Sequence, residues 1–119
     1  MSLPARLYPR IIGAATCAYG AFTLARPQSL VDAAQLPADR GAALLATSVG
    51  ARDLLSGAAL LVCPPGPALR AAVAARVAAD ACDVIAFGRH CPPQTRLKAV
   101  AIAGGWAAVC AGAYPFASR

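Results

Sequence analysis

The stretch VGARDLLSGAALLVC, residues 49–63, places an arginine and an aspartate side by side inside a long apolar run. The run extends from about residue 41 to 63, and a helix of ~20 residues crosses a ~30 Å hydrocarbon core. Arg52 and Asp53 therefore lie near the middle of a predicted span. Inserting two central charges costs about 6 kcal/mol, whereas the leucines and valines of the run contribute only about 4 kcal/mol. This helix needs polar partners from the rest of the chain.

The composition of the whole chain also favours a membrane environment. Of the 119 residues, 59% are hydrophobic and 13% are charged, against roughly 25% charged in average soluble domains. The frequent alanine and glycine suit closely packed transmembrane helices. We predict one integral membrane domain over residues 1–119, and a water-soluble four-helix bundle remains as the alternative.

The net charge of +6 does not indicate a nucleic-acid partner. The arginines are scattered singly and flank the apolar runs, whereas nucleic-acid-binding proteins gather them on one face or tail. We interpret them as anchors at the membrane boundary, so that membrane lipid is the expected partner. The two sides of the predicted membrane carry similar numbers of positive charges, which leaves the orientation open.

Four apolar segments are separated by turn signals, at residues 11–25, 41–63, 68–88 and 99–117. The last three have spanning length, and the first reaches it only by including residues 7–10 or by tilting. Ser29 and Asp32 resemble a capping box, which predicts a short interfacial helix that ends at Pro37. Asp39 is expected to cap the next helix. The predicted fold is all-α: a four-helix transmembrane bundle with a short interfacial helix between its first two helices.

The segment 68–88 carries three charges on one predicted helical face. Arg76, Asp80 and Asp83 are spaced i, i+4, i+7, so their side chains point the same way. In a membrane they must face the bundle and satisfy each other. The simplest pairing joins Arg52 to Asp80, because both lie near the midplane, and leaves Asp53 and Asp83 to compete for Arg76. One carboxylate is then left over, and in a low-dielectric interior we expect it to hold a proton near neutral pH.

Aromatic and polar residues at the same depth predict a central pocket beside these charges. Small residues and one tryptophan would form its walls. In acid–base chemistry a protonated Asp80 or Asp83 would donate, Arg52 would stabilise developing negative charge, and Asp53 would orient Arg52. The candidate catalytic residues are Arg52, Asp53, Asp80 and Asp83, and the candidate ligand contacts are Trp106, Tyr19 and Arg76.

The sequence gives no indication of a metal or a cofactor. His90 is the only histidine, and the five cysteines show no C-x-x-C spacing. A glycine-rich phosphate-binding loop followed by lysine is also missing.

Two short elements resemble the DoxX-like group of small, uncharacterised four-helix membrane proteins. They are Gly50-x-Arg52-Asp53, with Gly57 further along, and Asp80-x-x-Asp83. The leader YGAFTLARPQSL, residues 19–30, is also similar. The resemblance implies a four-helix integral membrane fold with buried polar residues. The site residues that the resemblance implies are only Arg52, Asp53, Asp80 and Asp83.

Three roles for the charges stay open: pairing that fixes helix register, a ligand or catalytic site, and a proton path. Accordingly, the chain would bind or act on a small lipophilic molecule, or serve as an accessory subunit of a membrane complex. A proton-coupled exporter is a third hypothesis and would require an oligomer. For the accessory subunit, Gly104-x-x-x-Ala108-x-x-x-Gly112 predicts a close-packing outer face for a partner subunit.

Overall fold

The computed structural model describes residues 3–37 and 39–117, and within these residues it contains helices and no strand. The elements in chain order are α1 (Leu3–Ala25), α2 (Pro27–Ala34), α3 (Arg40–Val62), α4 (Pro67–His90), α5 (Pro93–Ala111) and the short 3₁₀ helix η1 (Tyr114–Phe116). The all-α prediction is confirmed, and so is a short helix between the first two long ones.

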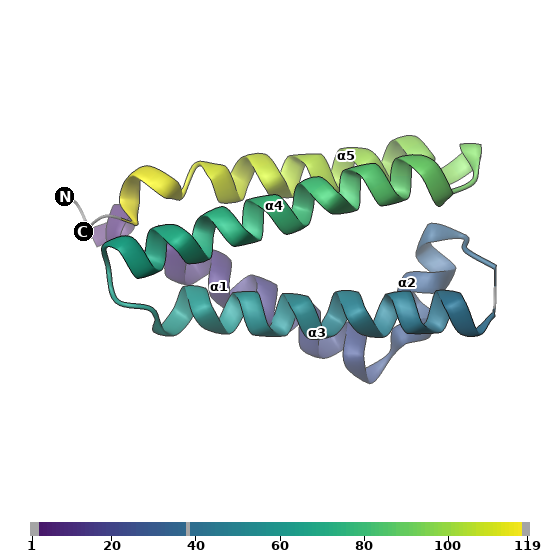
Figure 1. The fold of residues 1–119 in the computed structure, drawn as a ribbon, viewed down its shortest axis with the longest axis horizontal. Helices are drawn as coiled ribbons and strands as arrows, with labels where there is room; N and C mark the ends of the chain where they lie inside the picture. Colours follow the sequence, from purple (N-terminus) through teal and green to yellow (C-terminus); the bar gives the residue numbers. More distant parts are fainter. Residues whose placement is uncertain (1–2, 38, 118–119) are drawn as a thin grey trace.

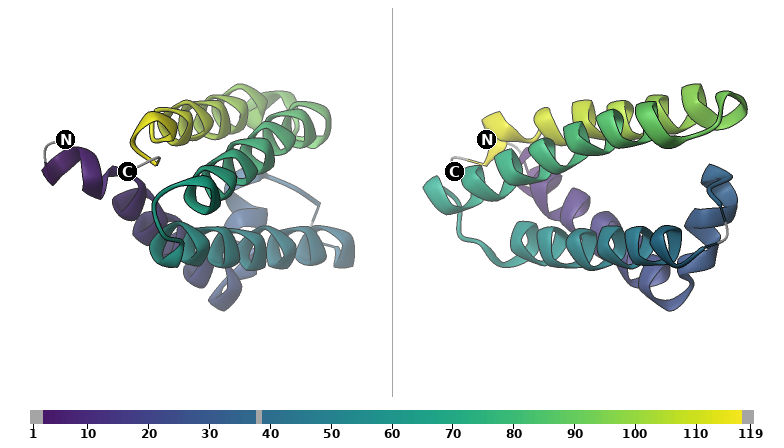
Figure 2. Two further views of the ribbon diagram at one scale, coloured as in Figure 1. Left: turned by 60° about the vertical axis from the view of Figure 1, so that its left-hand side comes forward. Right: turned by 45° about the vertical axis from the view of Figure 1, so that its right-hand side comes forward.

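The four long helices run alternately in opposite directions and form two layers (Figure 1). α1 packs along α3 in one layer, and α4 packs along α5 in the other. α2 lies at the end of the molecule away from the chain termini, where it packs mainly on α3 (Figure 1, Figure 2). Contacts between the layers are far fewer than contacts within them. The fold is therefore two tightly packed helix pairs laid one over the other.

Glycines allow α1 and α3 to approach closely. A Cβ at Gly57 would lie 2.6 Å from the backbone N of Cys17, and a Cβ at Gly20 would overlap the backbone N of Leu54. Any other residue would force the two backbones apart, as in the small-residue interfaces of membrane helices. Both helices carry their interface glycines two turns apart, at Gly13, Gly20, Gly50 and Gly57.

Capping decides where two of the helices begin. Asp39 caps α3 as predicted, because its carboxylate accepts a hydrogen bond from the backbone N of Ala42 at 2.8 Å. The capping box predicted at Ser29 is wrong. α2 already begins at Pro27, and the Ser29 hydroxyl donates to the backbone carbonyl of Arg26. Proline at the first helical position needs no hydrogen-bond partner for its nitrogen, which favours this earlier start.

Two helices begin well before the apolar segments that predicted them. α1 continues back through Pro9 to Leu3, so it has 23 residues and reaches spanning length without tilting. α5 begins at Pro93 rather than near residue 99. In both cases the extension carries basic residues, which a search for apolar runs excludes.

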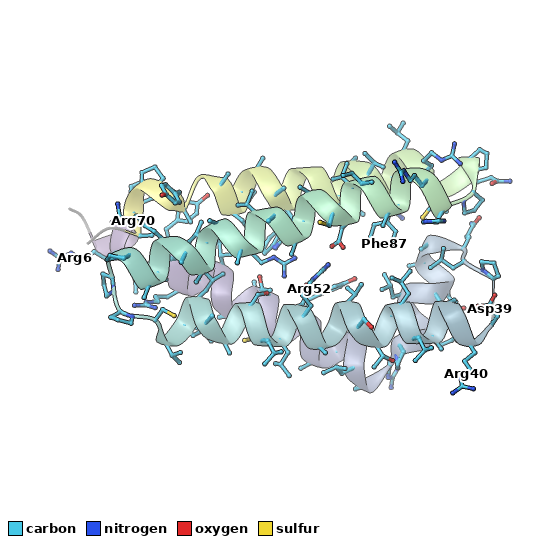
Figure 3. All side chains as sticks on the ribbon, viewed as in Figure 1. Arg6, Asp39, Arg40, Arg52, Arg70 and Phe87 are labelled. Atoms are coloured by element: carbon cyan, nitrogen blue, oxygen red, sulfur yellow. The ribbon has the colours of Figure 1, made fainter. Side chains whose placement is uncertain are left out.

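Many large apolar side chains face outward, whereas the charged side chains in the middle of α4 face inward. Leu55, Val62 and Leu97 are 72%, 77% and 80% exposed, whereas Arg76 and Asp80 are almost completely buried. Water-soluble bundles have the opposite distribution. Of the arginines labelled in Figure 3, Arg6, Arg40 and Arg70 lie at the two ends of the molecule, and Arg52 lies between the layers.

Two segments, Arg40–Val62 and Pro93–Phe116, are long and apolar enough to cross a membrane. Length and composition thus single out two of the four predicted spans. α4 has 24 residues but includes the charged face formed by Arg76, Asp80 and Asp83, which lowers its hydropathy.

Candidate functional site

An ion-pair network joins the two layers near the middle of α3 and α4. Arg52 of α3 donates two hydrogen bonds to Asp83 of α4, from Nη1 to Oδ1 and from Nη2 to Oδ2, each at 2.7 Å. Its Nη2 also lies 3.1 Å from Asp53 Oδ1. Bidentate guanidinium–carboxylate pairs of this kind are strong and fix orientation as well as distance.

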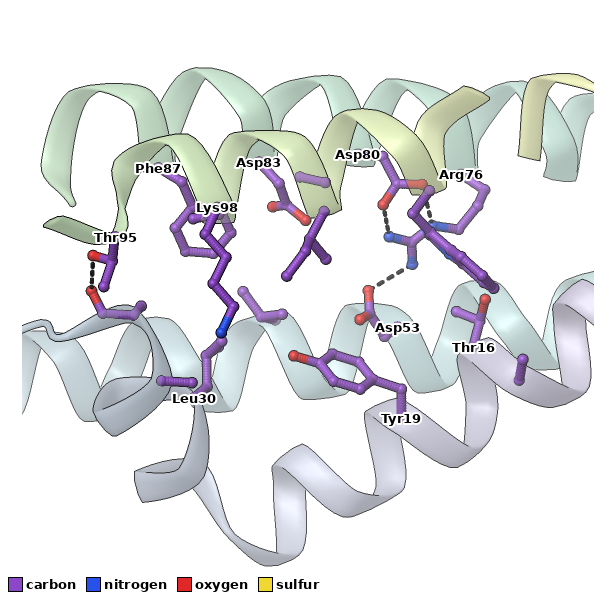
Figure 4. A pocket seen from close by; sticks show the side chains of 18 residues that line it. Thr16, Tyr19, Leu30, Asp53, Arg76, Asp80, Asp83, Phe87, Thr95 and Lys98 are labelled. Atoms are coloured by element: carbon purple, nitrogen blue, oxygen red, sulfur yellow. Dashed lines mark hydrogen bonds and ion pairs between the residues drawn. The ribbon is translucent and has the colours of Figure 1, made fainter. Parts of the chain in front are cut away.

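Arg76 of α4 forms the buried half of the network. Its Nη1 donates to Asp53 Oδ1 at 2.5 Å and to the Ser56 hydroxyl at 2.9 Å, both on α3. Its Nε donates to Asp80 Oδ2 at 3.1 Å, and its Nη2 donates to Asp80 Oδ1 (Figure 4). The chain of contacts therefore runs from Asp83 through Arg52, Asp53 and Arg76 to Asp80.

The predicted pairing of Arg52 with Asp80 is wrong. Of the two carboxylates left to compete for Arg76, Asp53 pairs with it and Asp83 does not. Asp80 lies one turn after Arg76 on the same face of α4 and pairs with it there. Asp83 then faces Arg52. The expectation of one carboxylate left over is also wrong, because each of the three carboxylates accepts from a guanidinium.

A pocket of about 350 Å³ opens between the two layers beside this network (Figure 4). All five helices contribute to its wall, and α2 closes one end. There the Thr95 hydroxyl of α5 donates to the backbone carbonyl of Ala34 at 2.9 Å. One side of the pocket is charged and the rest is largely apolar. The wall comprises Ala15, Thr16, Tyr19, Leu30, Ala33, Ala34, Val49, Asp53, Arg76, Asp80, Asp83, Phe87, Thr95, Lys98, Ala99, Ile102, Ala103 and Trp106.

The structure brings the predicted site residues together around this pocket. Its wall includes six of the seven, namely Asp53, Asp80, Asp83, Arg76, Tyr19 and Trp106. Arg52 is the exception, and it acts on the pocket indirectly by holding the carboxylate of Asp83.

Sequence reasoning missed the pocket residues of α2 and one cation. Leu30 and Ala33 line the pocket, and Lys98 extends across it toward Leu30 (Figure 4). Lys98 precedes Trp106 by two helical turns and therefore shares its face of α5, which is the signal that could have identified it. The α2 residues carried no such signal, because a short helix can pack on either layer.

One fully buried hydroxyl in the pocket wall lacks a hydrogen-bond partner. The Thr16 hydroxyl is buried and has no partner among the described residues. Threonines in helices commonly donate to the carbonyl one turn earlier, and that bond is not made here. A buried unsatisfied hydroxyl costs about 1–3 kcal/mol, so a ligand that satisfies it gains affinity.

The described residues contain no group of three or more histidine, cysteine, aspartate or glutamate side chains arranged to hold a metal ion. The three aspartates are close in space, but guanidinium groups occupy the positions where a cation would bind.

Comparisons with protein families, with curated protein sequences and with solved structures find no match to this chain. The resemblance to the DoxX-like group therefore rests only on the Gly-x-Arg-Asp and Asp-x-x-Asp elements and the leader YGAFTLARPQSL.

Proposed function

We propose that the chain is a multi-pass integral membrane protein whose four long helices cross the bilayer and enclose a binding pocket for a small lipophilic molecule. The observation that carries this proposal is the pocket of about 350 Å³ with a largely apolar wall and a buried charge network on one side. Ligand sites commonly combine such a wall with a few well-placed polar groups.

The distribution of side chains supports the membrane part of the proposal. α1, α3 and α4 have 23, 23 and 24 residues, and about 20 are needed to cross a bilayer. The charges that make α4 too polar to insert alone point inward and are paired, which is how intramembrane charges are accommodated. Large apolar side chains on the outer faces of α3 and α5 suit contact with lipid.

Asp53 is the best candidate for acid–base chemistry in this pocket. Both oxygens of Asp80 and both oxygens of Asp83 accept hydrogen bonds from arginine. Asp53 Oδ1 accepts from two arginines, whereas its Oδ2 accepts no hydrogen bond from the described residues. The role of proton acceptor therefore falls to Asp53, with Arg76 stabilising the negative charge that develops.

The membrane location is tested with Cys82, which is exposed on the outside of α4 near the middle of the helix. In a chain whose other cysteines are changed to alanine, a hydrophilic maleimide should label Cys82 slowly in opened membranes and rapidly after denaturation. The control carries Pro65→Cys, in the exposed loop between α3 and α4, as its sole cysteine and should be labelled rapidly in both states. Equal labelling of the two cysteines in membranes would contradict a bilayer around α4.

Ligand binding is tested on protein purified in mild detergent, against a panel of small lipophilic molecules with different polar groups. A molecule present at a hundred times its Kd should stabilise the fold by about 2.7 kcal/mol, measured as a higher unfolding temperature. Asp53→Asn should lose this stabilisation, whereas Asp32→Asn, an exposed control on α2, should keep it. The binding proposal fails if no molecule stabilises the wild type or if Asp53→Asn responds equally.

An accessory subunit of a membrane complex is the second candidate. It is favoured by the pairing of every carboxylate in the network with an arginine, because such ion pairs can fix helix register with no ligand. A partner recovered in stoichiometric amount from mild detergent, together with an empty ligand screen, would favour this candidate.

A further inference from the structure

A second cavity continues the pocket along α1. It has a volume of about 280 Å³ and lies between α1 and α5, which otherwise make few contacts with each other. Ala15 and Trp106 belong to the walls of both cavities. The other residues of the second wall are Tyr8, Ile11, Ile12 and Val109. The two cavities therefore adjoin at Ala15 and Trp106, with the charge network on one side of Trp106 and an apolar groove on the other.

The groove ends near the end of the molecule that holds the chain termini. There the Tyr8 hydroxyl donates to the backbone carbonyl of Val109 at 2.9 Å and joins α1 to α5. Thr16 and Tyr8 are eight residues apart, which corresponds to about 12 Å along a helix. A molecule that occupied both cavities would therefore be linear rather than compact.

Two unused hydrogen-bonding groups face the pocket at its charged side. The Thr16 side chain is 2% exposed, and its hydroxyl has no partner among the described residues. Asp53 Oδ2 receives no hydrogen bond from these residues either. One group requires a hydrogen-bond donor, and the other can donate or accept.

A hydroxyl group matches this pair best. It can donate to Asp53 and accept from Thr16 at the same time. A carboxylate or phosphate placed between Asp53 and Thr16 would have no hydrogen to donate to the Asp53 carboxylate and would be repelled by it, and an ether has no hydrogen to donate either. An ammonium group could donate to both oxygens but would lose its hydration in a largely apolar pocket.

We infer that the pocket binds a single-chain lipophilic alcohol, with its hydroxyl between Asp53 and Thr16 and its apolar chain passing Trp106 into the groove between α1 and α5. This inference rests on the proposed binding function and specifies the class of ligand. The groove lies between two helices whose outer faces are apolar, so the chain of the ligand would also be open to exchange with surrounding lipid.

The test uses dodecanol that carries a bromine on a carbon near its hydroxyl end, where the proposed chain passes Trp106, because bromine quenches tryptophan fluorescence at contact distance. Trp106 is the only tryptophan of the chain, so the signal reports on one position. The matched probe is the methyl ether of the same bromoalcohol, which partitions into detergent similarly but cannot donate a hydrogen bond. We expect saturable quenching by the alcohol and only weak, non-saturable quenching by the ether. The corresponding bromoamine tests whether an ammonium group can replace the hydroxyl, and tighter binding of the amine would overturn the assignment of an alcohol.

Two conservative variants locate the hydroxyl group. Thr16→Val removes the hydroxyl with little change in shape and should weaken binding of the bromoalcohol about 3- to 10-fold. Thr23→Val is the control, because Thr23 is equally buried on α1 but lies outside the pocket wall. It should bind like the wild type. Unfolding temperatures of both variants show whether each one remains folded.

Equal quenching by alcohol and ether, or equal binding by Thr16→Val and wild type, would overturn the inference. If a compact molecule from the wider panel stabilises the protein while no bromoalkane quenches saturably, this inference fails and the proposed binding function stands. If neither the panel nor the bromoalkanes bind, both fail.

Discussion

Arg76 is buried to 1% exposure, and each nitrogen of its guanidinium donates to a side-chain oxygen of α3 or α4. Burying a charge costs several kcal/mol unless it is paired and hydrogen-bonded, so this complete satisfaction makes the position tolerable. The sequence predicts this burial from the stripe of charges in an apolar segment. The sequence does not predict which carboxylate pairs with which arginine, because Asp80 and Asp83 lie within one helical turn of each other and either could face Arg52. The rotation of α4 about its axis decides between them, and packing against α5 sets that rotation.

The assignment of Arg52 to Asp83 predicts a specific energetic coupling. In a double-mutant cycle, Arg52→Met and Asp83→Asn should show a coupling energy of about 1–2 kcal/mol, since the pair is bidentate and only partly exposed. The matched cycle of Arg52→Met with Asp80→Asn should give a much smaller value, because Asp80 is paired with Arg76 and forms no ion pair with Arg52. Both cycles are measured by unfolding in detergent. A larger coupling energy between Arg52 and Asp80 than between Arg52 and Asp83 would contradict the observed pairing and support the pairing predicted from the sequence.

At the scale of the helix, the α1–α3 interface depends on residues that have no side chain. The apolar segments are visible in the sequence, but their glycines do not show which neighbour they face. The outer close-packing face predicted at Gly104 and Gly112 illustrates this limit. A Cβ at Gly104 would lie 3.8 Å from Val84 of α4, and one at Gly112 would lie 3.0 Å from the Tyr8 hydroxyl. These two glycines thus have neighbours within the bundle. The spacing of small residues in the sequence could not show whether they face the bundle or a partner subunit.

Two glycine substitutions should differ in their effect on the free energy of unfolding. Gly20→Ala places a methyl group against the backbone of Leu54 and should destabilise the fold by about 1–3 kcal/mol. Gly105→Ala is the matched control, because nothing lies within 4 Å of a Cβ at this helical position. It should be neutral or stabilise by up to about 1 kcal/mol through its higher helix propensity. Thermal unfolding in detergent measures both, and a neutral Gly20→Ala would show that α1 and α3 are not in close contact.

At the scale of the whole molecule, the two helix pairs are held together by few contacts. Between their middles lie the ion pairs of Arg52 with Asp83 and of Arg76 with Asp53. At the ends, the Thr95 hydroxyl reaches α2, and the Tyr8 hydroxyl of α1 donates to the backbone carbonyl of Val109 of α5 at 2.9 Å. The sequence predicts four helical segments and a charged centre. It does not predict that the bundle divides into two layers, because each segment has apolar residues on several sides.

This division predicts that the chain can be split in the loop between α3 and α4. Fragments 1–64 and 65–119, expressed together, should assemble and co-purify in mild detergent, since each contains one tightly packed helix pair. Arg52→Met with Asp53→Asn in the first fragment removes that layer's side of the ion pairs and should reduce recovery of the second fragment severalfold. The control, Arg40→Met with Asp32→Asn, removes the same charges from exposed positions and should leave recovery unchanged. Equal recovery of the second fragment with both variants of the first would mean that end contacts and apolar packing hold the layers together. The ion-pair network would then contribute to the pocket and not to the assembly of the layers.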